Sequence, residues 1–241
     1  MNFPHALRSV RQRHRLSQLN LAQRAGTTQR HISFMESGRS RPGRSMVVRL
    51  GESMKLTLRE RNELLRCAGY APVYPQTPLE DPGLEHVRTA LRHVLAGHQP
   101  YPAIVVDSRH ELVLANDAFG LLTEGAAEHL LHPPVNVLRL ALHPEGLASR
   151  IVNLAQWAQH VLDRILPDDL YEELADYVPH PAAGPDHVGF AVPLRLRSAR
   201  GELRLTTTIT TFATALDVTV AERKLEAFLP ADAATAALLA K

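Results

Sequence analysis

Residues 18–36 read QLNLAQRAGTTQRHISFME, and their spacing predicts two short helices joined by a tight turn. Ala22 is small at the point where two helices would cross closely, and Gly26 permits the left-handed backbone that a tight turn requires. Ile32 and Met35 lie three residues apart and form an apolar seam on the second helix. A seam buried on one side leaves the other side of this helix free, which is the arrangement that a helix-turn-helix requires.

The free side of the second helix carries side chains that can read base edges. Gln29 can form two hydrogen bonds with an adenine edge and Arg30 two with a guanine edge, and each such pair gives about 1–3 kcal/mol of discrimination. Phe34 can contact a thymine methyl group, and Gln18 can place its amide on a phosphate. The basic loop after the helix would add backbone contacts that do not depend on sequence. The predicted DNA-binding residues are Gln18, Thr28, Gln29, Arg30, His31, Ser33, Phe34, Arg39, Arg41 and Arg44.

The charge distribution favours the same function. Residues 1–70 contain 14 Arg and Lys residues against 4 Asp and Glu, a net charge of +10, whereas the remainder has 13 basic and 21 acidic residues, a net charge of −8. A basic head on an acidic body indicates that the head alone meets a polyanion. Two alternatives stay open here, namely a basic face that is only solvated and a helical hairpin that binds another protein.

The apolar periodicity divides the chain into three parts. Five short helices are predicted within residues 1–70, an all-α domain in which Ser17, Thr28, Ser45 and Thr57 are placed to cap helices. Residues 71–82 contain four prolines in twelve positions and predict a linker.

Residues 83–241 are predicted to form an α+β domain with an antiparallel sheet. A helix is expected first, then two strands, a helical middle and three further strands. The expected strands cover residues 103–106, 112–115, 188–196, 203–212 and 224–229.

A candidate ligand site lies on a helix expected over residues 149–166. Five of its residues fall within roughly a quarter of the helix circumference, at about 100° per residue. They are Arg150, Asn153, Trp157, His160 and Arg164. An indole flanked by cationic donors suits an apolar chain with a carboxylate head. The alternative is a half-exposed helix with the tryptophan in the core and the arginines in solvent.

Other classes of protein are not supported by the sequence. The single cysteine excludes an internal disulfide framework and fits a reducing cytosol, so a cytoplasmic location is expected. There is no apolar run long enough for a membrane span, and no HExxH, GxSxG, P-loop or GxGxxG motif. His129 and His132, and Asp107 and His110, are three residues apart but lack a third ligand at a recognisable spacing. We therefore expect no metal, no cofactor and no enzymatic activity.

At this point two family resemblances can be stated. LSQLNLAQRAGTTQRHISFMESGRSRP, residues 16–42, resembles the Cro/C1-type (XRE) helix-turn-helix family of repressors, with Thr27 in place of the aliphatic residue often found after the turn glycine. DPGLEHVRTALRHVLAGHQPYPAIVVDSRHELVLAND (81–117), NLAQWAQHVLDRI (153–165) and TTITTFATALDVTVAERKLEAFLPAD (207–232) resemble regulators with an MmyB-like ligand-binding domain. That resemblance implies a PAS-like fold, a five-stranded antiparallel sheet with helices over one face.

Together the resemblances imply a transcription regulator whose PAS-like domain senses a small apolar ligand such as a fatty acid. We expect a homodimer on a palindromic operator in double-stranded DNA, because one small helix-turn-helix makes few contacts and two-fold dimers match palindromic sites. The alternative function is a DNA-binding regulator whose second domain serves only dimerisation or binding of a protein partner.

Overall fold

The computed structural model of the protein describes residues 2–165, 169–178, 192–212 and 214–240. The chain divides into two units. The first consists of residues 1–78 together with residues 213–221, and the second of residues 79–212 together with residues 222–241. Within the described ranges, no helix is both long enough and apolar enough to cross a lipid bilayer.

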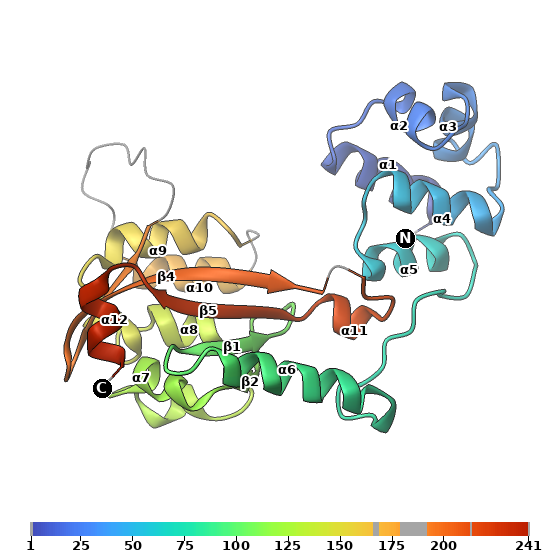
Figure 1. Cartoon of the computed structure of the whole chain (residues 1–241). Helices are drawn as coiled ribbons and strands as arrows, with labels where there is room; N and C mark the ends of the chain where they lie inside the picture. The colour runs from blue at the N-terminus through green and yellow to red at the C-terminus, as the bar shows by residue number, and fades with distance from the viewer. Residues whose placement is uncertain (1, 166–168, 179–191, 213, 241) are drawn as a thin grey trace. The chain divides into compact units, whose positions relative to one another are not determined.

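The first unit contains the five helices that the sequence predicts, drawn from blue to cyan in Figure 1. They are α1 (Phe3–Arg13), α2 (Gln18–Arg24), α3 (Gln29–Glu36), α4 (Arg44–Ser53) and α5 (Leu58–Cys67). Their apolar sides meet in one core, in which Leu21, Ile32 and Met35 are fully buried. The seam predicted for α3 is thereby confirmed, and α2 and α3 pack against each other as a helix-turn-helix.

Local capping determines where these helices begin. The hydroxyls of Ser17 and Thr28 each accept a hydrogen bond from the backbone N–H three residues later, at 3.0 Å and 3.2 Å. Thr57 forms a full capping box on α5. The prediction for Ser45 is wrong, because α4 begins at residue 44 with Gly43 as its N-cap, so that Ser45 lies inside the first turn.

Residues 71–78, the first part of the expected linker, pack with the first unit. Asn62 on α5 is buried, and its side-chain oxygen accepts hydrogen bonds from the N–H groups of Val73 and Tyr74, both at 3.1 Å. The same side chain donates to the carbonyl of Tyr74 at 2.7 Å. Three hydrogen bonds from one buried amide therefore hold this proline-rich segment against α5.

Residues 213–221 also belong to the first unit, although they connect two strands of the second. They contain the short helix α11 (Val218–Ala221), whose first N–H donates to the carbonyl of Pro75 at 2.8 Å. The carboxylate of Asp217 accepts from the N–H of Thr77 at 3.0 Å and also caps α11. The chain thus passes back from the second unit into the first between the strands β4 (Gly201–Thr211) and β5 (Lys224–Pro230).

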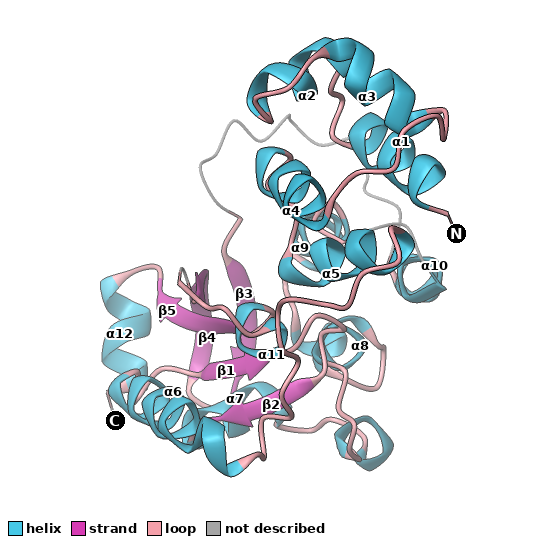
Figure 2. Cartoon of the chain, turned by 90° about the vertical axis from the view of Figure 1, so that its right-hand side faces the viewer, coloured by secondary structure: helices cyan, strands magenta, loops and turns pink. Residues whose placement is uncertain are grey.

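The second unit is built on a five-stranded sheet, magenta in Figure 2. Its strands are β1 (Ala103–Val106), β2 (Leu112–Ala115), β3 (Leu194–Ser198), β4 (Gly201–Thr211) and β5 (Lys224–Pro230). Their order is β2-β1-β5-β4-β3 and all neighbours are antiparallel. The predicted α+β class is confirmed. The strand expected from residue 188 begins at Leu194, and residues 188–191 lie outside the described residues.

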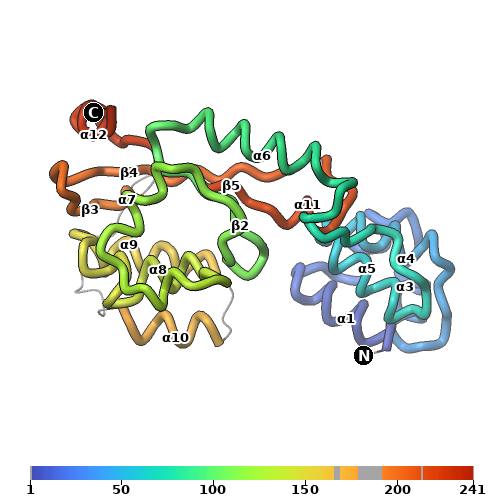
Figure 3. The backbone as a smooth tube through the Cα atoms, turned by 90° about the horizontal axis from the view of Figure 1, so that it is seen from below, coloured from blue at the N-terminus to red at the C-terminus, as the bar shows by residue number. Residues whose placement is uncertain are grey.

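Helices cover both faces of this sheet, whereas the PAS-like resemblance implies one (Figure 3). On one face, α6 (Glu85–Gly97) packs on Ala103, Val105, Leu225 and Ala227. The other face carries α8 (Val137–Leu142), α9 (Leu154–Leu162) and α10 (Asp169–Tyr177). Because successive side chains of a strand point to opposite faces, a sheet buried on both sides has apolar residues at every position of β1. The second unit also contains shorter helices. Four of them lie between β2 and α9 in the chain: η2 (Asp117–Phe119), α7 (Gly120–Thr123), η3 (Glu128–Leu131) and η4 (Leu147–Arg150). Another, η1 (Pro82–Leu84), precedes α6, and α12 (Ala233–Leu239) follows β5.

Candidate functional site

The outward side of α3 is the candidate DNA-reading surface. Thr28, Gln29 and Arg30 are exposed at its N-terminal end, and His31, Ser33 and Phe34 are half-buried along it. The Thr28 hydroxyl is engaged as the helix cap, and Nδ1 of His31 lies 3.0 Å from the hydroxyl of Thr27. Gln29 and Arg30 therefore present the most accessible polar groups at the start of the helix, where base contacts in this motif are made.

Phe34 holds two arginines beside this surface. The guanidinium carbon of Arg30 lies 5.1 Å from the centre of the Phe34 ring, and that of Arg39 lies 5.9 Å from it. Both distances fit cation–π contacts. Phe34 thus orients one arginine of the helix and one of the loop, a role that its sequence position alone did not indicate. Its predicted contact with a thymine methyl group stays a prediction.

Gln18 lies in a buried polar network behind the helix-turn-helix. Arg11 donates to both carboxylate oxygens of Glu36, at 2.6 Å and 2.9 Å, and also to the carbonyl of Leu16 at 2.7 Å. The amide of Gln18 donates to the same carboxylate at 2.8 Å. Burial alone raises the pKa of Glu36, but the hydrogen bonds from Arg11 and Gln18 outweigh it and hold the pKa below its ordinary value. One N–H of Gln18 is therefore committed to Glu36, which leaves the other for the predicted phosphate contact.

The three loop arginines differ in their surroundings. Arg39, Arg41 and Arg44 are all exposed, as backbone contacts require. Arg39 lies against Phe34, and the guanidinium of Arg41 reaches the carbonyl of Ala68 at the end of α5 at 3.5 Å. Arg41 thus has a weak partner within its own unit, while Arg44 begins α4 with its side chain in solvent.

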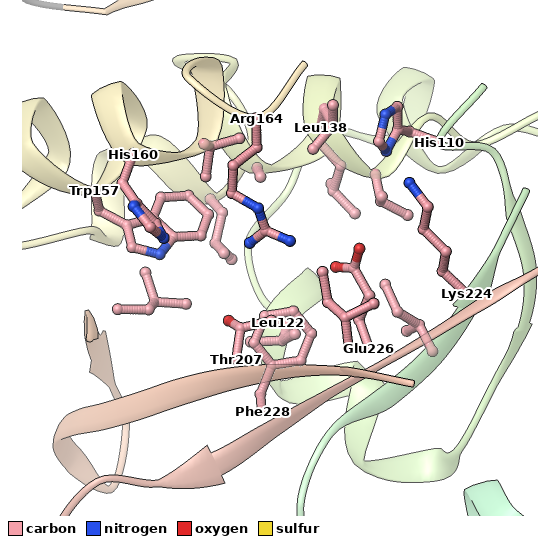
Figure 4. Close-up of a pocket in the computed structure, with 18 of the residues that line it drawn as sticks. His110, Leu122, Leu138, Trp157, His160, Arg164, Thr207, Lys224, Glu226 and Phe228 are labelled. Carbon is pink, nitrogen blue, oxygen red and sulfur yellow. The ribbon is translucent and has the colours of Figure 1, made fainter. Parts of the chain in front are cut away.

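The second unit contains a cavity of about 140 Å³ between the sheet and the layer of α8 and α9 (Figure 4). Most of its wall is apolar, with residues from β1, β4, β5, α8 and α9. Trp157 forms part of this wall and is 7% exposed. The polar residues that line it are His110, His160, Arg164, Thr206, Thr207, Lys224 and Glu226. An apolar cavity with a few convergent polar groups is the usual form of a small-molecule site.

The structure divides the five residues expected to form one stripe. Trp157, His160 and Arg164 line the cavity, whereas Arg150 and Asn153 are not among its described lining residues. The expected continuous helix is wrong here, because α9 begins only at residue 154 and the preceding segment is held by the sheet.

Arg150 and Asn153 have structural partners instead. The guanidinium of Arg150 donates to the carbonyls of Glu124 at 2.7 Å and Arg197 at 3.0 Å. Asn153 donates to the carbonyl of Pro193 at 2.9 Å and accepts from the N–H of Arg195 at 3.0 Å. Both side chains therefore join the start of α9 to the chain around β3.

Sequence reasoning missed the side chains that the sheet contributes. Lys224, Glu226 and Phe228 alternate along β5 and face the cavity, while Leu225 and Ala227 face α6. The period-2 pattern of this strand was the available signal, since it places a glutamate on the same face as a buried phenylalanine. Thr206 and Thr207 of β4 and His110 before β2 also reach the cavity.

Glu226 is a carboxyl group in the cavity lining whose pKa is shifted. Burial raises the pKa of its carboxyl, and the positive charges of Arg164 and Lys224 oppose that rise without cancelling it. In Figure 4 its carboxyl and the guanidinium of Arg164 point toward each other across the cavity. Among the described residues, neither a hydrogen bond nor an ion pair within bonding distance reaches this carboxyl.

One group of side chains could hold a metal ion. His129, His143 and Glu145 place their ligand atoms within 4.8 Å of one another, in the part of the chain that the structure describes. However, Nδ1 of His143 accepts a hydrogen bond from the N–H of Glu145 at 3.1 Å. That bond keeps the proton on Nε2 in the neutral ring, so neither nitrogen has a free lone pair as the site stands. His132, which the sequence analysis paired with His129, is not part of this group, and its Nε2 lies 3.5 Å from Oε1 of Glu128.

Two family models match the chain. Residues 7–61 match the helix-turn-helix family, and residues 87–166 match the MmyB-like transcription regulator ligand binding domain. No curated protein matches the sequence. A solved structure titled "Structure of an RNA-binding Light-Oxygen-Voltage Receptor" aligns at 15% identity over 95% of this chain and 59% of its own length, and its TM-score of 0.28 is too low to carry an argument. The chain therefore carries an XRE-type helix-turn-helix region followed by an MmyB-like ligand-binding domain, the combination expected of a ligand-responsive transcription regulator.

Proposed function

We propose that the chain recognises a specific DNA sequence through α3 and regulates transcription as a homodimer on a palindromic operator. The observation that carries this proposal is the exposed N-terminal end of α3, where Gln29 and Arg30 are free to enter a major groove and Phe34 orients Arg30. The net charge of +10 over residues 1–70 supplies the general attraction to DNA.

The DNA proposal is tested with two arginine variants. An operator is first selected from a randomised duplex library, and binding to it and to random DNA is measured over a range of salt concentrations. Arg30→Ala should weaken operator binding by about 1–3 kcal/mol and relax the preference at one base pair. Arg44→Ala, the matched control, should weaken both DNAs alike and reduce the salt dependence. If both variants behaved identically on operator and random DNA, α3 would not be the reading helix.

We further propose that the cavity binds a small apolar acid, of which a fatty acid is the simplest example. Arg164 and Lys224 are the cations that would meet the carboxylate, and Trp157 with the aliphatic wall would cover the tail. The volume of about 140 Å³ is close to that of an engineered cavity of about 150 Å³ that binds benzene. The present cavity therefore favours a short or medium chain, and a long acyl chain would require the helical layer to move.

The only tryptophan of the chain provides the assay for this site. Because Trp157 lines the cavity, its fluorescence should change on titration with octanoate. Octanol, which has the same tail without the charge, is the control ligand. Arg164→Met should weaken octanoate binding and leave octanol binding nearly unchanged. Absence of any fluorescence change with straight-chain acids, together with no acid found by native mass spectrometry of the purified protein, would rule this ligand class out.

A route from ligand to DNA follows from the course of the chain. Strands β4 and β5 both line the cavity, and the segment that connects them, residues 213–221, packs with the helix-turn-helix unit. A ligand that binds one arrangement of these strands more tightly would shift the population of dimer geometries and hence operator affinity. If octanoate bound the cavity but left operator affinity unchanged, the second unit would serve dimerisation or partner binding only.

A further inference from the structure

Among the lining residues that the structure describes, Glu226 is the acidic one, and its position is unusual for a site that receives an acid. It lies on β5, the central strand, paired with Ile104 on one side and Ile209 on the other. Figure 4 shows its carboxyl directed into the cavity, between Arg164 and Lys224. Since no described residue donates a hydrogen bond to it, the carboxyl is available to whatever occupies the cavity.

The two protonation states of Glu226 have opposite effects on an anionic ligand. As a carboxylate, Glu226 repels the ligand and competes with it for the positive charges of Arg164 and Lys224. As a carboxylic acid, it has one O–H to donate, and a carboxylate ligand is a strong acceptor for that hydrogen. A neutral Glu226 and a charged Arg164 can therefore both bond to the same ligand head group.

We propose that Glu226 is a specificity-determining residue that couples binding of an anionic ligand to uptake of a proton. The inference rests on the proposed function of the cavity and deepens it, because it makes the response depend on pH as well as on ligand concentration. The burial that raises the pKa of Glu226 brings its protonation closer to neutral pH, where such coupling can act.

The other charged groups that face Glu226 must be considered together with it. Arg164 follows α9 and Lys224 shares β5, and both line the cavity. His160 on α9 and His110 before β2 also line the cavity. Both are titratable side chains of the same cavity, so that a pH dependence of binding alone does not identify Glu226. A variant of Glu226 that cannot ionise separates its contribution from that of the histidines.

Glu226→Gln is that variant, because an amide keeps the shape of the side chain and donates a hydrogen bond at every pH. Octanoate binding to the full chain is followed by Trp157 fluorescence between about pH 6 and pH 8, where the probe itself stays ionised. Wild-type affinity should fall by up to about tenfold per pH unit above the pKa of Glu226, and Glu226→Gln should lose most of this slope and bind more tightly at the upper end. Titration calorimetry of the wild type in two buffers of different ionisation enthalpy should show uptake of about one proton per octanoate.

The outcomes separate this inference from the function on which it rests. If the wild type binds octanoate without proton uptake, or if Glu226→Gln keeps the full pH slope, the proton coupling is wrong while the ligand site stands. If octanoate binds neither protein at any pH, the proposed ligand class itself fails, and the coupling fails with it. Absence of proton uptake by the wild type would overturn the coupling even if the variant did not fold.

Discussion

Removal of one partner of the buried Arg11–Glu36 ion pair should strongly lower the stability of the first unit, which contains the helix-turn-helix. Its side chains are 10% and 3% exposed, and they join α1 to the end of α3 through two hydrogen bonds of 2.6 Å and 2.9 Å. Arg11→Met removes the cation and leaves the Glu36 carboxylate buried, with the amide of Gln18 as its remaining donor among the described residues.

The expected cost of Arg11→Met follows from this burial. Breaking a buried pair from one side costs about 3–5 kcal/mol, because the remaining charge has lost both water and partner. A small domain has a total stability of about 5–15 kcal/mol, so the variant should be near the limit of folding. At about 4–8 °C per kcal/mol for a unit of this size, its melting temperature should fall by more than about 10 °C. Operator binding should fall in parallel.

Two further variants make the reasoning refutable. The double variant Arg11→Met/Glu36→Leu replaces both charges by apolar groups, and it should recover most of the lost stability. Arg66→Met removes one partner of the exposed Arg66–Glu63 pair and should cost less than about 1 kcal/mol. Melting is followed by circular dichroism of the full chain. If Arg11→Met melted as Arg66→Met does, or if the double variant were no better than the single, the pair would not act as a buried unit.

The same pair predicts a pH dependence with a definite sign. The pKa of Glu36 is lower in the folded chain than its ordinary value of about 4.3, so its contribution to stability is fully present above that value. The contribution is lost as the pH falls through the lower folded pKa. Acid unfolding of the first unit should therefore be less steep in the double variant, which has no carboxylate at this position, than in the wild type.

The second unit gives three further predictions, each measurable by urea unfolding followed through tryptophan fluorescence. Gly146→Ala should cost about 1–3 kcal/mol, because the new Cβ would lie 2.1 Å from the carbonyl oxygen of Leu140, whereas Gly97→Ala has open space at the end of a helix and should be neutral or stabilising. Asn116→Ala should lower the free energy of unfolding by more than about 3 kcal/mol, since this buried side chain forms hydrogen bonds with three backbone groups, at 3.0, 3.2 and 2.9 Å. A loss of less than about 1 kcal/mol would show that these hydrogen bonds contribute little. Glu226→Gln should stabilise the unit at neutral and alkaline pH and make no difference below the ordinary carboxyl pKa, because the raised folded pKa means that the wild type loses stability as the pH rises through it.

The parts of the fold that sequence predicted correctly depend on interactions between residues near in the chain. The hydroxyls of Ser17 and Thr28 cap α2 and α3 by accepting a hydrogen bond from the backbone N–H three residues later. Ile32 and Met35 are both buried because they lie on the same side of α3. The five strands were found from their composition and alternation. In the candidate ligand site, the helical spacing correctly grouped Trp157 and His160 of α9 with Arg164, which follows α9, around one cavity.

Only the tertiary structure decided what these local elements meet. An isolated bridge between Ile151 and Leu196 interrupts the expected helix and takes Arg150 out of the predicted stripe. β5 places Glu226 in the same cavity as Arg164, although the two residues are some sixty positions apart in the sequence. Residues 213–221, which connect β4 and β5, belong to the first unit. Caps, turns and helical faces are set by hydrogen bonds and packing within a few residues, and a single sequence therefore determines them. The polar lining of a cavity arises from strand pairing and layer packing between distant segments, and the partners in such contacts are fixed only when the whole unit folds.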